Sequence, residues 1–94
     1  MIYEWDPAKA NGNLRDHGVS FEEAATVFLD PLAVTYPDPD HSEREDREIT
    51  IGHSVTQRIL FVSHCQRGVR IRIISARKAT RKECKQHEEG KAGK

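Results

Sequence analysis

The stretch Val69–Lys78 limits the possible folds more than any other part of this 94-residue chain. Its first residues alternate between apolar and basic: Val69, Ile71 and Ile73 take one set of alternate positions, and Arg70 and Arg72 take the other. A period of two residues is typical of a β-strand with one buried face. We therefore predict a strand that packs its isoleucines against a core and presents its arginines on the opposite face.

The same stretch is rich in positive charge, because Arg70, Arg72, Arg77 and Lys78 fall within nine residues. Cations held on a rigid strand are candidates for phosphate binding, but a charged strand face can also be plain solvated surface. Residues 1–48 contain 4 Lys and Arg against 12 Asp and Glu, whereas residues 49–94 contain 11 against 3. This asymmetry predicts separate acidic and basic surfaces, one of which could meet nucleic acid or an acidic partner.

The chain length predicts one domain, over residues 1–89, and the composition predicts a flexible tail over residues 90–94. Cys65 and Cys84 form neither a disulfide framework nor a CxxC pair, which favours a reducing compartment. The N-terminus lacks the apolar segment of a signal peptide, and no later run reaches membrane-spanning length. We therefore expect a cytoplasmic protein with no membrane contact.

Two helices are predicted in the first third of the chain. Asp6–Pro7 is a helix-start signal, and Gly18 is a stop signal. Within this first helix Ala10, Leu14 and His17 share a face, so we expect His17 to be packed or to cap the helix rather than to act in catalysis. A capping box at residues 20–23 starts the second helix, which ends at residues 30–31.

The rest of the chain predicts strands and one more helix. The predicted strands cover residues 32–36, 48–52, 59–64 and 69–76, with a hairpin turn at residues 66–68. A second capping box, at residues 80–83, starts a short polar helix. Residues 2–5 could add an edge strand. The predicted fold class is α+β: a small antiparallel sheet with two N-terminal helices on one face and a short C-terminal helix.

Metal and cofactor sites have little support in the sequence. His41, His53 and His64 lie near predicted strand ends, but no HxH, HExxH or CxxC spacing occurs, so any metal site would have to be assembled by the fold alone. The glycines are isolated and form no phosphate loop. We expect no metal and no cofactor.

The pattern that does suggest chemistry is acid–base catalysis on an RNA phosphodiester. Such cleavage needs a base for the 2′-hydroxyl, an acid for the leaving 5′-oxygen, and cations for the charged transition state. The candidates for acid and base are His41 and Glu45, and the candidate clamps are Arg47, Arg72 and Arg77. Arg70, Lys78 and Arg81 would hold the flanking RNA. The competing interpretation is that the charges at residues 43–47 form a solvated salt-bridge cluster.

Several motifs occur in order along the chain. They are Trp5-Asp6-Pro7, residues 17–24 (HGVSFEEA), residues 27–31 (VFLDP), Asp40-His41-Ser42 with Glu45 and Arg47, and residues 72–77 (RIISAR). With these motifs the chain resembles the BrnT family of bacterial type II toxin–antitoxin ribonucleases from Trp5 to about Glu89. Three positions depart from the usual pattern: Asp16, Arg44 and His87.

The resemblance implies a RelE-like fold and a toxin that inhibits translation by cleaving RNA. It also implies neutralisation by a cognate antitoxin, BrnA, with a ribbon-helix-helix DNA-binding domain, so that DNA is met only through the antitoxin. The family pattern points to His41, Glu45, Arg47, Arg72 and Arg77, the residues that the chemistry also selects.

Two other functions remain open at this stage. The basic strand could bind RNA or an acidic antitoxin segment without doing chemistry. Sequence-specific DNA binding has weaker support, because the sequence shows no helix-turn-helix and no recognition helix.

Overall fold

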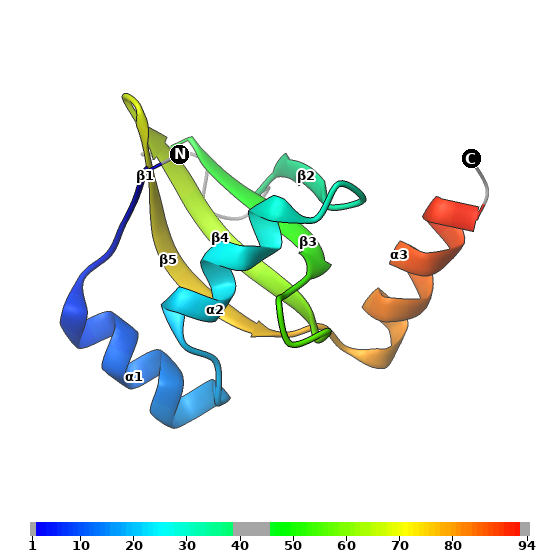
Figure 1. Cartoon of the computed structure of the whole chain (residues 1–94), viewed down its shortest axis with the longest axis horizontal. Helices are drawn as coiled ribbons and strands as arrows, with labels where there is room; N and C mark the ends of the chain where they lie inside the picture. The colour runs from blue at the N-terminus through cyan, green and yellow to red at the C-terminus, as the bar shows by residue number, and fades with distance from the viewer. Residues whose placement is uncertain (1, 39–45, 93–94) are drawn as a thin grey trace.

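The computed structural model describes residues 2–38 and 46–92 of the chain. Along the chain the elements are β1 (Ile2–Glu4), α1 (Pro7–His17), α2 (Phe21–Thr26), the 3-10 helix η1 (Val27–Leu29), β2 (Val34–Pro37), β3 (Arg47–His53), β4 (Ile59–Arg67), β5 (Arg70–Lys78) and α3 (Arg81–Ala92). The fold is α+β, as predicted. Helices α1 and α2 lie over one face of the sheet, whereas α3 follows the end of β5 and stands apart from them (Figure 1).

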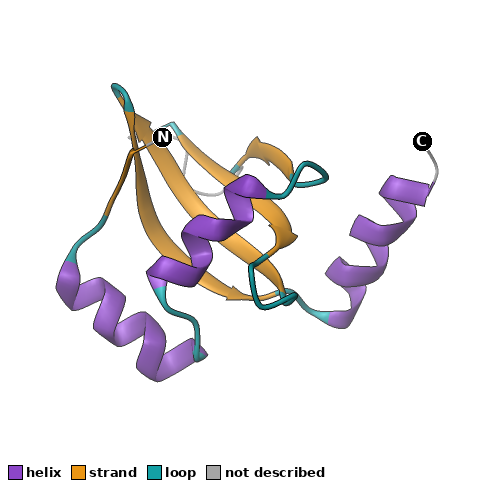
Figure 2. Cartoon of the chain, viewed as in Figure 1, coloured by secondary structure: helices purple, strands orange, loops and turns teal. Residues whose placement is uncertain are grey.

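The five described strands form one sheet in the order β1-β5-β4-β3-β2 (Figure 2). Strands β2 to β5 are antiparallel to their neighbours, but β1 pairs in parallel with β5. The prediction of a purely antiparallel sheet was therefore wrong at this edge. The physical reason is the connection: α1 and α2 carry the chain away from β1, and β5, which comes last, can then take the position beside β1 in the parallel direction.

The local signals for the ends of α1 are confirmed. The Asp6 side chain accepts a hydrogen bond from the backbone N–H of Ala8, and Gly18 adopts the left-handed conformation (φ 68°). On the face that these positions were predicted to share, Ala10 packs against the core, but Leu14 is 52% exposed and His17 is exposed rather than packed. Helix α1 is instead turned so that Asn13 faces the interior.

Asn13 connects three parts of the fold. Its Nδ2 donates to the carbonyl oxygens of Val19 (2.9 Å) and Ala76 (2.8 Å), and its Oδ1 accepts from the N–H of Ala76 (3.0 Å). A buried amide that satisfies backbone groups in this way costs little to bury and orients the elements that it joins. Asn13 thereby ties α1 to β5.

The core lies between α2 and the sheet. Buried residues of the second helical segment and of the preceding loop meet buried residues of β4 and β5. They are Val19, Phe21, Ala24 and Val27 on one side and Leu60, Val62, Ile73 and Ala76 on the other. The buried side of α2 is thus formed by Phe21 and Ala24. Burial of these side chains provides the main driving force for folding.

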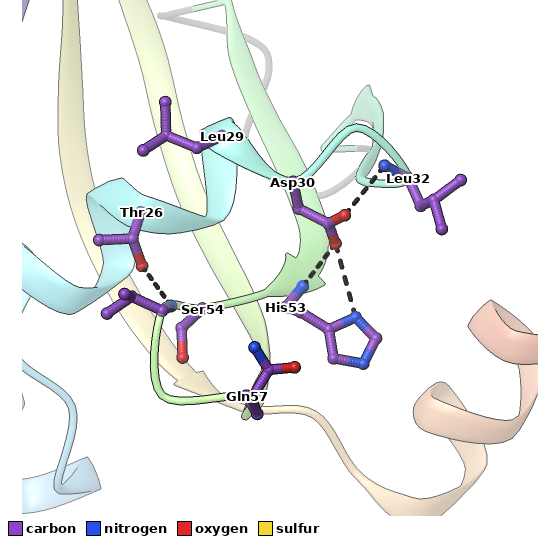
Figure 3. Close-up of a pocket in the computed structure, with 8 residues that line it drawn as sticks. Thr26, Leu29, Asp30, Leu32, His53, Ser54 and Gln57 are labelled. Carbon is purple, nitrogen blue, oxygen red and sulfur yellow. Dashed lines mark hydrogen bonds and ion pairs between the residues drawn. The ribbon is translucent and has the colours of Figure 1, made fainter.

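Asp30 ends the helical segment, as predicted, and also holds the end of β3. Its carboxylate accepts hydrogen bonds from the N–H groups of Leu32 (2.9 Å) and His53 (2.8 Å) (Figure 3). Burial favours a higher pKa for Asp30, but these backbone hydrogen bonds outweigh it and lower the pKa. An ionised Asp30 therefore joins two loops at one end of the sheet.

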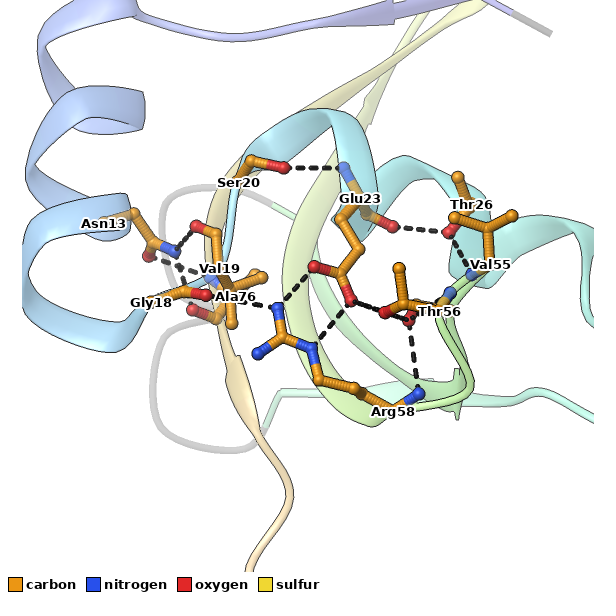
Figure 4. A network of polar contacts seen from close by, with 11 residues as sticks. Asn13, Gly18, Val19, Ser20, Glu23, Thr26, Val55, Thr56, Arg58 and Ala76 are labelled. Atoms are coloured by element: carbon orange, nitrogen blue, oxygen red, sulfur yellow. Dashed lines mark hydrogen bonds and ion pairs between the residues drawn. The ribbon is translucent and has the colours of Figure 1, made fainter.

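The first predicted capping box forms only in part. Ser20 Oγ accepts from the N–H of Glu23 (3.0 Å), but the Glu23 carboxylate turns to Arg58, with Arg58 Nε donating to Oε2 over 2.9 Å (Figure 4). Arg58 Nη2 also donates to Glu23 Oε1, and the hydroxyls of Ser54 and Thr56 donate to Oε2. Glu23 thus joins α2 to the loop between β3 and β4.

The second predicted capping box, at the start of α3, is complete. The N–H of Glu83 donates to Thr80 Oγ1, and the N–H of Thr80 donates to Glu83 Oε1.

Strand β5 alternates as predicted at first, with Ile71 and Ile73 buried. The predicted turn is displaced: β4 continues to Arg67, so that residues 68–69 form the loop and Val69 is 76% exposed.

Strand β5 contains a bulge further along. His64 pairs with Ile73 and Ser63 pairs with Ser75, so Ile74 is an extra residue in β5. This bulge reverses the alternation and brings Ala76 to the core side.

Candidate functional site

The face of the sheet opposite α1 and α2 carries the predicted clamps. Cross-strand partners point to the same side of a sheet, so the register places Arg72, Cys65 and Arg47 in one row across β5, β4 and β3. A second row contains Arg77, Phe61 and Ile51. We call this the cation face and define it by Arg47, Arg72 and Arg77 together with the residues between them in these rows.

The bulge at Ile74 is the reason that these arginines share a face. Arg72 and Arg77 are five residues apart, and in a regular strand an odd separation places side chains on opposite sides. With one extra residue between them, both point away from the core. The structure therefore brings together the three arginines that the sequence had suggested as clamps.

Arg47 and Arg72 are separated across the sheet by Cys65. Two strand spacings correspond to about 9.5 Å between their backbones, and a long side chain at each end can reach toward the middle. Both side chains are half-buried. Arg72 Nη1 donates to Glu4 Oε2 over 3.0 Å, and Arg70 Nη1 lies 3.8 Å from the other oxygen of Glu4. The carboxylate from β1 thus lies beside the cations of β5.

Arg77, at the other end of the cation face, contacts one aromatic and one acidic neighbour. Its guanidinium carbon lies 4.0 Å from the centre of the Phe61 ring, a cation–π contact. Its Nη1 and Nη2 donate to the two oxygens of Glu83, over 2.8 and 3.0 Å. These hydrogen bonds lower the pKa of Glu83 to about 2 against the opposing effect of burial, and they raise the pKa of Arg77. A planar guanidinium that pairs two oxygens of Glu83 can pair two oxygens of a phosphate in the same way.

Tyr36 is a candidate that the sequence reasoning missed. It pairs with Ile49 of β3 and therefore falls on the cation face, between the rows of Arg72 and Arg77. Burial and then the charge of Glu83 raise its pKa, so its hydroxyl keeps its proton and can donate a hydrogen bond to a phosphate oxygen. The sequence placed Tyr36 at the end of the predicted strand at residues 32–36 but gave no reason to connect it with the arginines of β5.

The remaining predicted residues are distributed as follows. His41 and Glu45 lie outside the described residues, and so does Arg44. The last described residue before them, Asp38, donates its N–H to the carbonyl oxygen of Arg47 (3.0 Å), which places both ends of this part of the chain beside Arg47. Lys78 is exposed and pairs with Leu60, which places it on the opposite side from the cation face. Arg81 is exposed in the first turn of α3.

His64 belongs to the core rather than to a reactive site. Its Nε2 lies 2.7 Å from the hydroxyl of Thr50, and its ring packs edge-on against Phe28. Burial lowers the pKa of His64 to about 4, so the ring is neutral at pH 7. His64 is thus a structural residue.

Comparisons with known proteins concern the family and the fold of the chain. A family model described as "Ribonuclease toxin, BrnT, of type II toxin-antitoxin system" matches residues 5–83. The chain is also similar to a solved structure, the 1.1 Å crystal structure of the Brucella abortus ribonuclease toxin BrnT, with a TM-score of 0.68 and 24% sequence identity. The similarity covers 86% of this chain and all of the other, and at this identity it supports the fold alone. No curated protein sequence matches the chain.

Among the described residues, no helix is both long and apolar enough to cross a membrane.

Proposed function

Because the chain belongs to the BrnT family of ribonuclease toxins of type II toxin–antitoxin systems, we propose that it cleaves RNA on the cation face without using a metal ion. The observation that carries this proposal is the row formed by Arg47 and Arg72, which lies beside the described ends of the segment that contains His41 and Glu45. Cations and an acid–base pair would then be available at one phosphodiester.

The scissile phosphate lies above Cys65 in this proposal, between Arg47 and Arg72. One of His41 and Glu45 removes the proton of the 2′-hydroxyl, whose oxygen attacks phosphorus, and the other protonates the departing 5′-oxygen. The arginines stabilise the additional negative charge of the transition state. The products are a 2′,3′-cyclic phosphate and a free 5′-hydroxyl.

Arg77 and Tyr36 bind the neighbouring part of the RNA strand. Their partners on β4, Cys65 and Phe61, are four residues apart, which corresponds to about 13 Å at about 3.3 Å per residue, so Arg72 and Arg77 bind different phosphates. RNA that reaches Arg77 competes with Glu83, which already accepts hydrogen bonds from both terminal nitrogens, Nη1 and Nη2. Arg70 extends the binding surface at the other end, whereas Lys78 and Arg81 contact RNA only outside the cation face.

In the cell, we propose, cleavage of RNA by this toxin arrests translation in the cytoplasm. The antitoxin partner carries a ribbon-helix-helix domain, and the toxin meets DNA only through that domain. The support is the membership of a toxin–antitoxin family together with the uneven charge of the chain, which offers an acidic and a basic surface to a partner.

The test is induction of the chain in a bacterial host, with growth and total RNA followed in parallel and with purified protein assayed on RNA in EDTA. Arg47→Gln and Arg72→Gln remove one charge each from the central row, and Arg15→Gln is the matched control, because Arg15 is exposed on α1 and pairs only with the adjacent Asp16 in the described structure. We expect growth arrest and EDTA-resistant fragments from the wild type and Arg15→Gln, and at least a hundredfold slower cleavage from the other two.

A folded wild-type chain that leaves RNA intact in both settings would contradict the proposal. RNA binding that is steeply dependent on salt, without any product, would then identify the chain as a binding module. Cleavage that is abolished by EDTA would contradict the metal-free chemistry alone.

A further inference from the structure

One group of side chains outside the cation face has the composition of a metal site. Asp30 follows η1, His53 ends β3, and His87 lies in the second turn of α3. One potential ligand atom from each of the three lies within 4.8 Å of the other two. We propose that these three residues bind a divalent transition-metal ion of the zinc type and thereby fasten α3 to the body of the protein.

The donor set fits such an ion. Two imidazole nitrogens and one carboxylate oxygen form a common three-ligand set for zinc and related ions, with a fourth position left for water. His53 Nδ1 lies 3.5 Å from Asp30 Oδ2, and the His53 and His87 rings are 6.2 Å apart between centres. His87 is only 7% exposed, which shields one side of the group from solvent.

Asp30 is oriented for this role by the backbone. Its two oxygens accept one backbone N–H each, from Leu32 and His53, and Oδ2 also lies 3.5 Å from His53 Nδ1, a contact that the bound ion would replace. A carboxylate has about four acceptor sites, so sites remain for the ion. Hydrogen bonds of this kind orient a metal ligand. Gly52 permits the close approach, because a Cβ there would lie 3.1 Å from Asp30 Oδ2 and 2.8 Å from the Ala33 Cβ.

Access to the group comes from an adjoining pocket of about 470 Å³. Asp30 and His53 form part of its wall, beside polar and apolar side chains of the same loops (Figure 3). A pocket of this size admits a hydrated ion and leaves room for water at the fourth coordination position.

The geometry requires a small closure when the ion binds. Ligand atoms around a tetrahedral zinc lie about 3.4 Å apart, given bonds of about 2.1 Å, so separations of up to 4.8 Å in this group must shorten by at most about 1.4 Å. Helix α3 is joined to β5 only by residues 79–80 and stands apart from α1 and α2 (Figure 1). A slight shift of α3 or a rotation of His87 is sufficient.

The site differs in position and in role from the proposed ribonuclease site. It lies at the end of β3 opposite to Arg47, and no step of RNA cleavage uses it. It does share a helix with Glu83, which is one turn before His87 and pairs with Arg77. An ion that fastens α3 therefore also holds Glu83 in place.

The experiment uses the purified full chain after treatment with EDTA and removal of the chelator. Zn²⁺ binding is measured by calorimetry, Co²⁺ is used as a spectroscopic probe of the ligand geometry, and the midpoint of thermal unfolding is recorded with and without Zn²⁺. The variant is His87→Ala. The controls are His17→Ala, an exposed histidine on α1, and Cys84→Ser, a thiol on the same helix as His87.

We expect one Zn²⁺ per chain, a Zn²⁺-dependent rise in the unfolding midpoint, and a low-symmetry Co²⁺ spectrum for the wild type and both controls. His87→Ala should bind at least tenfold more weakly and lose the rise in midpoint. Equal affinity in His87→Ala, loss of binding in either control, or a Co²⁺ spectrum like that of the hydrated ion would overturn the proposal. None of these measurements depends on RNA cleavage, so the two proposals fail separately.

Discussion

Replacing Glu23 by Gln tests how the pair of Glu23 and Arg58 stabilises the fold. The Arg58 guanidinium is the main cause that lowers the pKa of Glu23, from 4.5 to about 2, and hydrogen bonds from Thr56 and Ser54 add to it against the effect of burial. At about 1.4 kcal/mol per pKa unit, this shift corresponds to about 3 kcal/mol. Since the Arg58 side chain is 31% exposed and partly screened by water, we expect Glu23→Gln to cost about 2–3 kcal/mol at pH 7.

The effect should depend on pH with a definite sign. The pKa of Glu23 is lower in the folded state than in the unfolded state, so its stabilisation is complete above pH 4.5 and is lost as the pH falls toward 2. By linkage, about half remains at pH 3. Wild type and Glu23→Gln should therefore become similar in stability between pH 4.5 and pH 2.

Urea unfolding followed by circular dichroism at pH 7, 4.5 and 3 measures these free energies. Glu22→Gln is the matched control, because Glu22 is the exposed neighbour in the same turn, and we expect it to change stability by less than about 0.5 kcal/mol. The reasoning is refuted if Glu23→Gln costs less than about 1 kcal/mol at pH 7, or if its cost is the same at pH 7 and pH 3.

Three further predictions concern other parts of the molecule. Asn13→Ala should lower the free energy of unfolding by about 2–4 kcal/mol, because it leaves buried backbone groups of Val19 and Ala76 without partners; urea unfolding measures this, and a loss below about 1 kcal/mol would contradict it. Glu83→Gln should free Arg77 for phosphate and tighten RNA binding several-fold at low salt, which fluorescence anisotropy detects; unchanged or weaker binding by a folded variant would argue against competition between Glu83 and RNA. The ring signals of His64 should keep the shifts of a neutral imidazole in NMR spectra down to pH 5, because burial lowers its pKa to about 4; titration near pH 6.5 would show that the ring is hydrated.

The sequence predicted part of the candidate catalytic site. The residue types and the strand at Val69–Lys78 identified Arg72 and Arg77, and the structure places both on one face with Arg47. Both arginines are half-buried and paired, Arg72 with Glu4 and Arg77 with Glu83, and the sequence pattern gave no indication of these partners. The roles of His41 and Glu45 stay predictions, since both lie outside the described residues. The helix α3 also continues to Ala92, past the point where the tail was expected to begin.

Local signals in the sequence determined where the helices begin and end. The start of α1 at Asp6, its stop at Gly18, the Ser20 cap and the complete capping box at Thr80 all form as predicted. Each depends on hydrogen bonds or backbone angles within about four residues, so the local sequence specifies these helix ends without help from distant parts of the chain.

Tertiary structure alone decided which side chains meet. The bulge at Ile74 places Arg77 on the cation face, the rotation of α1 buries Asn13 rather than Leu14, and β1 joins β5 in parallel. The fold likewise assembles Asp30, His53 and His87 without any ligand spacing in the sequence. These outcomes depend on strand register and core packing between residues far apart in the chain, where burying the apolar face and pairing every buried backbone group outweigh local preference.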